Sequence, residues 1–157
     1  MADTVELDPV DIEILRVLQN DARTSYRDLA AAAGVAPSTC LDRVSRLRRT
    51  GVIRGYTVRL DPAALGLPLQ AFLAVRTGPH HRPLVSQFVE HALAQPHTRA
   101  VHLVAGPDDY LIHVAARDVE DLQRVAVDAL TDRPGVMSVR TNLVFQSWQG
   151  GPLLPPT

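Results

Sequence analysis

Apolar residues recur at helical spacing through the first 50 residues of the chain, and this period predicts short amphipathic helices. The first begins at Pro9, directly after Asp8, and an acidic N-cap followed by proline is a typical helix start. Val10, Ile14 and Leu18 then share one face. The three predicted helices run from Pro9 to about Asn20, from the cap residue Ser25 to Gly34, and from Pro37 to Thr50.

The second and third predicted helices are separated only by Gly34-Val35-Ala36, which is the spacing of a helix-turn-helix. The third helix has a clear apolar side and a polar side opposite it. Its apolar side is predicted to consist of Cys40, Leu41, Val44 and Leu47.

After Asp61 to Gly66 the period changes, and strand-like runs alternate with helical ones. The order strand–helix–strand–strand–helix–strand is that of a ferredoxin-like unit. We therefore predict an α+β protein in which a helix-turn-helix precedes a ferredoxin-like βαββαβ domain. The predicted strands are Gln70–Arg76, Thr98–Val104, Tyr110–Ala116 and Val136–Gln146. The residues predicted to face inward are Leu84, Val85, Phe88 and Val89 from the first helix, and Leu122, Val125, Ala129 and Leu130 from the second, which Asp118 caps.

These patterns divide the chain into four parts. Residues 1–51 form the predicted helix-turn-helix domain, residues 52–66 a linker strand and hinge, and residues 67–148 the ferredoxin-like domain. The tail, residues 149–157, contains two glycines and three prolines, and we expect it to be a flexible end.

The overall composition excludes several classes of protein but leaves nucleic-acid binding open. The formal net charge is only -1, yet residues 38–60 contain six arginines against one acid, a local excess of +5. No apolar run approaches the roughly 20 residues that a membrane span needs. The acidic start is unlike a secretory signal, and the single cysteine, Cys40, excludes an internal disulfide. We expect a cytoplasmic protein without membrane contact.

The polar side of the third helix is the strongest candidate for a binding surface. Guanidinium groups pair with phosphates or guanine edges, and hydroxyls near a helix start suit phosphates or bases. An arginine-rich solvated face on a structural helical hairpin is the alternative, but the turn and the local charge together favour duplex DNA. The predicted DNA-binding residues are Ser38, Thr39, Asp42, Arg43, Arg46 and Arg49, with Arg54 shortly after the helix.

A long ordered series of short motifs runs from residue 5 to residue 146. The motifs are Leu7-Asp8, Asp11, Ile14-Leu15, the run from Gly34 to Leu41, Arg43-Val44, Arg46-Leu47, Gly51-Val52-Ile53, Gly55-Tyr56, Leu103-Val104-Ala105-Gly106, Asp109-Tyr110-Leu111 and Pro134-Gly135-Val136. In this series the chain resembles the leucine-responsive/asparagine-regulator (Lrp/AsnC) family.

The resemblance implies a transcription factor with an N-terminal winged helix-turn-helix. It also implies a C-terminal domain that binds amino acids and assembles dimers into octamers. The expected partners are double-stranded DNA, further copies of the chain and a small-molecule effector. No cofactor is expected. The linker strand, Val52 to Leu60, would pair with its copy in a partner, which makes Tyr56 an interface residue.

Two positions depart from the family pattern. Relatives usually place serine where this chain has Ala36, and losing that N-cap costs about 1 kcal/mol, which Pro37 partly offsets. Thr39 stands where some relatives have proline. Both changes bear on the operator sequence and leave the mode of binding as the family implies.

The turn Gly106 to Tyr110 is a candidate effector site. A carboxylate there can hold an ammonium group, and exposed turn amides can take a carboxylate. The family places its effector pocket at this turn, between dimers; a pure assembly surface is the alternative. Carried over by matching positions, the effector-binding residues are Leu103, Gly106, Asp108, Asp109, Tyr110, Val119, Asn142, Leu143 and Val144.

Other chemistry finds little support in the sequence. None of the six histidines has the spacing of a zinc site, so no metal is expected. Cys40 lies on an apolar helix side without a positioned base, and turn chemistry explains Asp108 and Asp109 without catalysis. We expect no catalytic residues.

Two alternatives to a ligand-responsive regulator remain open. Siroheme decarboxylases resemble the same two-domain layout, but their acidic substrate would need basic residues in the second half. Only seven of the 16 arginines lie beyond Leu60, which favours DNA. An architectural nucleoid protein with little sequence preference is the other alternative, and the sequence does not separate it from a local regulator.

Overall fold

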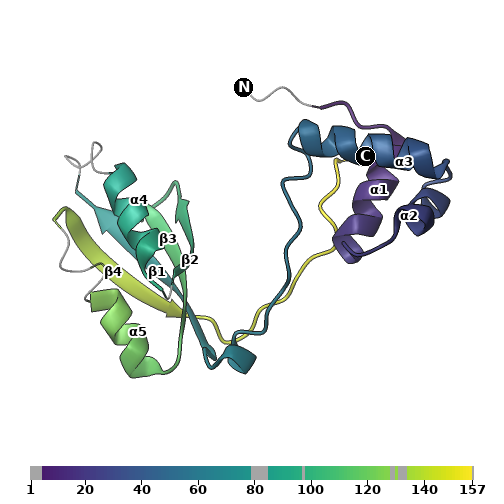
Figure 1. The fold of residues 1–157 in the computed structure, drawn as a ribbon. Coiled ribbons are helices and arrows are strands. Elements are labelled where there is room, and N and C mark those ends of the chain that lie inside the picture. Colours follow the sequence, from purple (N-terminus) through teal and green to yellow (C-terminus); the bar gives the residue numbers. More distant parts are fainter. Residues whose placement is uncertain (1–4, 79–84, 97, 128–129, 131–133, 157) are drawn as a thin grey trace. The chain divides into compact units, whose positions relative to one another are not determined.

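The computed structural model describes residues 5–78, 85–96, 98–127, 130 and 134–156 (Figure 1). The chain divides into two compact units. The first comprises the residues up to Val58 together with the tail from Gln149, and the second runs from Arg59 to Trp148. Each unit has its own cluster of buried apolar side chains.

The N-terminal unit contains three helices: α1 (Pro9–Asn20), α2 (Tyr26–Ala32) and α3 (Pro37–Arg49). A capping box opens α1, in which the Asp8 and Asp11 side chains each accept a hydrogen bond from the backbone N–H of the other residue. Ser25 caps α2, as predicted, whereas Ala36 gives α3 no side-chain cap. The buried core of this unit consists of Ile14, Leu15, Leu29, Ala30, Cys40, Val44 and Leu47.

Leu41 is not part of this core, and its assignment to the apolar side of the third helix is wrong. The side chain is 47% exposed, whereas Cys40, Val44 and Leu47 are at most 1% exposed. These three residues follow one another at spacings of four and three, which keeps them on one stripe of α3. Leu41 lies about 100° around the helix from Cys40, outside that stripe.

The tail from Gln149, predicted to be a flexible end, makes contacts with the N-terminal unit. The Gln19 side chain donates to the backbone carbonyl of Leu153 (3.0 Å) and accepts from its N–H (2.8 Å), and Leu154 packs against the core of the N-terminal unit. The amide of one side chain thus supplies the donor and acceptor that a neighbouring strand would supply. Composition could not reveal a contact made across 134 residues of chain.

The linking segment forms neither helix nor strand from Arg54 to Leu60 in the single chain. Its apolar side chains Tyr56, Val58 and Leu60 are 49%, 76% and 58% exposed. A strand needs a hydrogen-bonded neighbour. The predicted linker strand and its pairing with a second copy therefore stay predictions. A short 3-10 turn, η1 (Ala63–Leu65), follows.

The second unit has the predicted ferredoxin-like order. Strands β1 (Leu69–Thr77), β2 (Thr98–Leu103), β3 (Tyr110–Ala116) and β4 (Val136–Leu143) form one antiparallel sheet in the order β2-β3-β1-β4, with helices α4 (Val85–Ala94) and α5 (Val119–Ala126) in the two crossovers. The last strand ends at Leu143, three residues before the predicted end. Leu84 and Ala129, predicted to face inward, lie outside the described residues.

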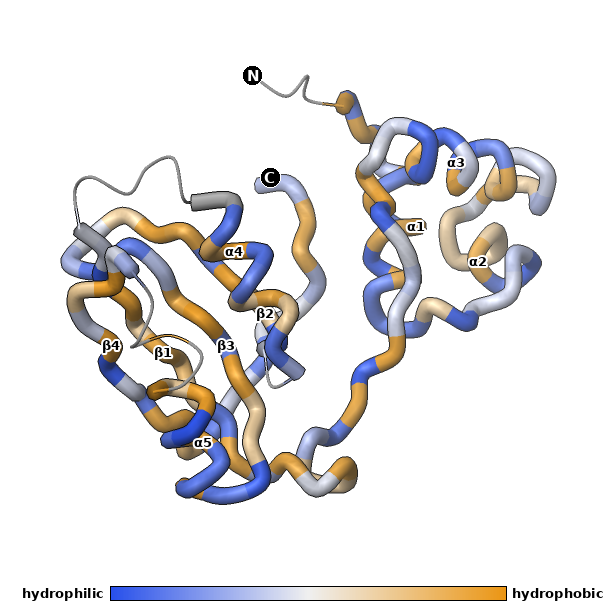
Figure 2. Tube along the Cα trace, turned by 60° about the vertical axis from the view of Figure 1, so that its left-hand side comes forward, coloured by the Kyte–Doolittle hydropathy of each residue, from blue (hydrophilic) through white to orange (hydrophobic). Residues whose placement is uncertain are grey.

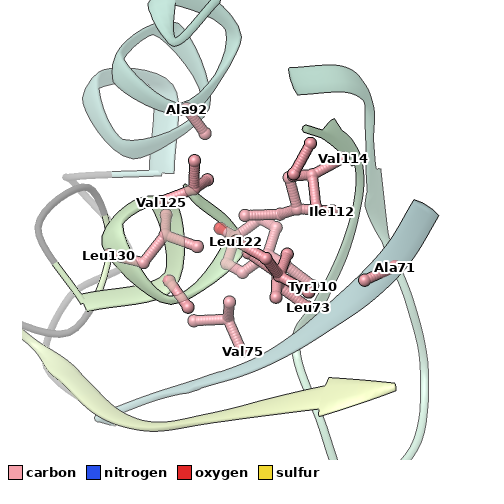
Figure 3. Close-up of a cluster of buried hydrophobic side chains, with 12 residues drawn as sticks. Ala71, Leu73, Val75, Ala92, Tyr110, Ile112, Val114, Leu122, Val125 and Leu130 are labelled. Atoms are coloured by element: carbon pink, nitrogen blue, oxygen red, sulfur yellow. The ribbon is translucent and has the colours of Figure 1, made fainter. Parts of the chain in front are cut away.

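Both helices cover the same face of the sheet, and the core lies between the two layers. Side chains from α5 and from the central strands point toward one another in Figure 3, with Ala92 of α4 above them. The central strands β1 and β3 are the most hydrophobic part of the sheet (Figure 2) because both of their edges and one of their faces are covered. Among the predicted inward residues, Leu122, Val125 and Leu130 are buried, and Phe88 and Val89 pack against the core.

The helix-free face of the sheet carries a stacked aromatic pair. The rings of Phe72 and His113 lie 4.9 Å apart, and His113 Nε2 lies 3.0 Å from Gln70 Oε1. Partial burial is the main cause that lowers the pKa of His113 below its ordinary value of 6.5. The positive charge of Arg99 and the neighbouring His102 lower this pKa further, by smaller amounts.

We expect this histidine to make the second unit less stable in mild acid. Between the lowered pKa of folded His113 and the ordinary pKa of the unfolded chain, the unfolded state binds more protons, so stability falls as the pH drops below about 6.5. Thermal midpoints of the parent and of His113→Gln, measured between about pH 8 and pH 5, test this. The variant should show the shallower decline, and equal declines would assign the pH dependence to other groups.

Candidate functional sites

The outer face of α3 is polar and open. Ser38, Thr39, Asp42 and Arg49 are exposed, and so is Arg54 after the helix. Arg43 and Arg46 are half-buried, with side chains 27% and 38% exposed. An open depression of about 500 Å³ runs along this face and is lined by Asp8, Thr39, Asp42, Arg43, Arg46 and Arg49. The structure thus brings six of the seven predicted DNA-binding residues onto one helix face, with Arg54 beyond its end.

Two of the arginines on this face are bound to acids at the start of α1. Arg43 donates from one terminal nitrogen to Asp8 (2.6 Å) and to Asp11 (3.1 Å), and Arg46 donates to the other oxygen of Asp11. The hydrogen bond from Arg43 lowers the pKa of Asp8, and the acids raise the pKa of Arg43. The positive excess of the region therefore falls from +5 to +3 once the two acids are counted.

Sequence reasoning missed these ion pairs, although α1 held a signal. Asp11 precedes Ile14 and Leu15 by three and four residues, so it shares their buried face. A carboxylate on the buried side of a helix needs a charged or hydrogen-bonding partner. The identity of that partner depends on how α1 and α3 pack, and only the structure shows this.

The predicted effector-binding residues lie at opposite ends of the sheet. Tyr110 pairs with Val75 at one end of β1, whereas Leu143 pairs with Ala71 toward the other, where Ala116 also pairs with Leu69. Strand β3 spans roughly 20 Å between these ends. Leu103, Gly106, Asp108, Asp109 and Tyr110 thus form one group, and Val119, Asn142, Leu143 and Val144 form another. The single chain does not bring them together in one pocket.

In the first group, both carboxylates of the turn have protein partners. Asp109 accepts hydrogen bonds from the backbone N–H (2.7 Å) and the hydroxyl (3.0 Å) of Thr77, and Asp108 pairs with Arg140 (2.5 Å). Tyr110 is buried against Phe88. Gly106 has a φ of 150°, which glycine adopts most readily. The turn is therefore tied to the end of β1 and to Arg140 within β4.

In the second group, two residues border a mostly apolar pocket. Val119 of α5 and Leu143 of β4 line a pocket of about 410 Å³ together with Leu122, Gln123, Ala126, Val127, Val139 and Thr141. Asn142 points to the other side of β4, where its side-chain amide donates to the carbonyl of Phe72 (3.2 Å).

The remaining candidates for chemistry do not form a site in the described part of the chain. No three metal-ligating side chains gather there, and His80, His81 and His97 lie outside it. Cys40 is buried, and burial raises the pKa of its thiol, which disfavours the reactive thiolate.

Comparison with known proteins identifies both units. Residues 7–48 match the AsnC-type helix-turn-helix domain, and residues 70–153 match the Lrp/AsnC ligand binding domain. The chain belongs to the Lrp/AsnC family. The chain is 42% identical over 145 residues to the HTH-type transcriptional regulator AldR of Mycolicibacterium smegmatis, covering 92% of this chain and 85% of that protein.

Two further relatives agree with this assignment. The leucine-responsive regulatory protein of Rhizobium meliloti is 35% identical over 142 residues, covering 90% of this chain and 91% of that protein. The crystal structure of a transcriptional regulator from Neisseria meningitidis in complex with L-Met has a TM-score of 0.87 at 28% identity, covering 96% of this chain and 97% of that one. This Lrp/AsnC chain is thus a helix-turn-helix transcriptional regulator. Among its described residues, no helix is long and apolar enough to cross a membrane.

Proposed function

We propose that this regulator binds specific duplex DNA sequences through the outer face of α3 and that a free amino acid changes its assembly or its operator affinity. The main support for DNA binding is the arrangement of side chains on α3. One helix face presents hydroxyls near its start and guanidinium groups farther along, beside an open depression. This is the side-chain set that reads base edges and holds phosphates in a major groove.

Self-association is part of the proposed function. A single helix-turn-helix contacts a short half-site, and two linked copies gain affinity through their effective concentration. The exposed residues Tyr56, Val58 and Leu60 of the linking segment offer apolar surface for a second copy. We propose an obligate dimer that assembles further, to an octamer. Sedimentation at micromolar concentration tests this, and a folded monomer would contradict it.

We propose an effector site between copies because the two residue groups are separated in one chain. The turn with Asp108 and Asp109 provides charge, whereas the pocket beside Val119 and Leu143 provides apolar surface, and one chain keeps them at opposite sheet ends. A second copy could bring the turn of one chain to the pocket of another. An amino acid held there would shift assembly by its differential affinity for the two arrangements.

The DNA half is tested by selecting sites from a pool of random duplexes with the purified chain. We expect one sequence to be enriched. Two copies of it should be spaced by about one turn of the DNA helix. A pool that is retained without any enriched sequence would favour an architectural protein. No retention at all would contradict DNA binding.

Arg46→Ala should weaken binding to the selected site by about 1–3 kcal/mol if the side chain contacts a base, or lower the salt slope by about 1 if it contacts a phosphate. Filter binding or anisotropy over a salt series measures both quantities. Arg16→Ala is the matched control because Arg16 lies on α1 and its ion pair is with Glu13 of the same helix. Equal affinity and equal slope in parent and Arg46→Ala would contradict the assignment of α3.

A further inference from the structure

Asp11 is a buried acid that contacts two of the proposed DNA-binding arginines. The residue is fully buried, at 0% exposure. Its two carboxylate oxygens are divided between two guanidinium groups of α3: one accepts from Arg43 (3.1 Å) and the other from Arg46. The second oxygen also accepts from the backbone N–H of Asp8 (3.2 Å), which fixes the carboxylate in the capping box.

Of the three residues Asp11, Arg43 and Arg46, only the acid is fully buried. The acid is enclosed, but Arg43 and Arg46 keep 27% and 38% of their side-chain surface exposed, beside the open depression on α3. Each guanidinium carries five N–H donors in a rigid plane. The hydrogen bonds to the acids of α1 use one terminal nitrogen of each arginine. Among the described residues, no hydrogen bond uses the other donors of these two guanidinium groups.

The spacing of Arg43 and Arg46 along α3 allows both to bind the same carboxylate. Arg43 and Arg46 are three residues apart, so they lie next to each other on the same side of α3. A free arginine samples many rotamers and must give up that freedom on contact with DNA. A fixed carboxylate that binds the guanidinium group removes most of this freedom before DNA arrives. The planar guanidinium group then loses little further entropy when it binds DNA.

We propose that Asp11 is a positioning residue for DNA recognition: it holds Arg43 and Arg46 in the orientation in which they meet the duplex. The inference rests on the proposed function, because it concerns the same α3 face. The cost of the arrangement is electrostatic, since Asp8 and Asp11 reduce the attraction of this face for any phosphate backbone. Asp11 therefore trades non-specific affinity for a defined geometry.

This trade gives Asp11→Asn two effects of opposite sign. Removing a negative charge beside the DNA face should strengthen binding to any duplex, whereas releasing the arginines should weaken binding to the selected site. The experiment measures dissociation constants for the selected duplex and for a scrambled duplex of equal length and composition. The ratio of interest is the dissociation constant for the scrambled duplex divided by that for the selected duplex. We expect this ratio to fall by roughly fivefold or more, which corresponds to the lower end of the discrimination energy of a single base contact.

Glu13→Gln is the matched control. It removes the same charge from the same helix, but Glu13 is paired with Arg16, and no hydrogen bond or ion pair among the described residues joins it to α3. The ratio for this variant should equal that of the parent. Asp8→Asn is the second test variant. Asparagine keeps the N-cap of α1 but weakens the pair with Arg43, so a smaller fall in the ratio is expected.

The outcomes separate this inference from the proposed function. If the parent does not distinguish the two duplexes, the proposed function fails. If the parent does so and folded Asp11→Asn binds both duplexes more tightly at an unchanged ratio, the acid only neutralises charge and the positioning role is wrong. Circular dichroism at the assay temperature shows whether Asp11→Asn is folded. If it is not, Asp8→Asn decides, because an unchanged ratio there would also overturn the proposal.

Discussion

Leu47→Ala should destabilise the N-terminal unit by about 2–5 kcal/mol while the ferredoxin-like unit stays folded. Leu47 is 0% exposed, and its removal would leave a cavity between α3 and the residues of α1 and α2 that share its core. A loss of this size is a large part of the stability of so small a domain. Hydrogen exchange followed by peptide mass analysis should show lost protection in α1 to α3 and retained protection in β1 and β3.

Leu41→Ala is the control for this prediction, because it makes the same substitution on the same helix. Leu41 is 47% exposed, so the change should stay within about 0.5 kcal/mol of the parent. Equal losses in the two variants would contradict the burial pattern of α3. Loss of protection in β1 and β3 of Leu47→Ala would show that the two cores unfold together.

Elements that rest on local chemistry could be predicted from the sequence. The start of α1 follows from Asp8 and Asp11, each of which accepts a hydrogen bond from the backbone N–H of the other, and from Pro9 at the first helical position. The bounds of β3 are those predicted, because the Gly106 to Asp109 turn ends the preceding strand and Asp118 caps the next helix. In such places the information needed to choose the conformation lies inside the element itself.

Contacts between distant parts of the chain could not be predicted. Gln19 meets Leu153 across 134 residues, and Asp11 meets Arg43 across 32, so neither pair leaves a periodic trace in the sequence. From the sequence, the six arginines on and after α3 are predicted to form a free positive surface. In the structure, two of them, Arg43 and Arg46, form ion pairs with acids at the start of α1. The outward position of Leu41 likewise depends on which stripe of α3 the other helices cover.

The candidate effector residues illustrate a third case. Their identities could be proposed from matching positions, but whether they meet depends on strand register. Because Tyr110 and Leu143 pair near opposite ends of β1, one chain keeps the acidic turn away from the apolar pocket. The sequence allows the residues of both parts to be proposed, and the sheet keeps them apart in one chain, which is why we propose that a second copy combines them.

Asp109→Ala should abolish the response of DNA binding to the effector and destabilise the ferredoxin-like unit by about 1–3 kcal/mol. The stability effect arises because the N–H and the hydroxyl of Thr77 lose the carboxylate that accepts from both. The functional effect arises because the same carboxylate is our candidate for holding the effector's ammonium group. Calorimetric titration of the parent with each of the twenty amino acids identifies the ligand. Operator affinity with and without that ligand measures the coupling, for which 1–3 kcal/mol, or roughly 5–150-fold, is typical.

Thr77→Val separates these two effects, because valine keeps the branched shape of the strand residue and removes only the hydroxyl that Asp109 accepts from. The backbone N–H of residue 77 still binds the carboxylate, so this variant should be modestly less stable and should keep the full response. If Thr77→Val loses the response as well, the loss in Asp109→Ala reflects a disturbed turn and carries no information about the ammonium group. If Asp109→Ala binds the amino acid with the heat and affinity of the parent, the ammonium is held elsewhere and the site proposed at this turn is wrong. If none of the twenty amino acids produces heat with the parent, the turn is an assembly surface, with Asp109 serving to fix the end of β1.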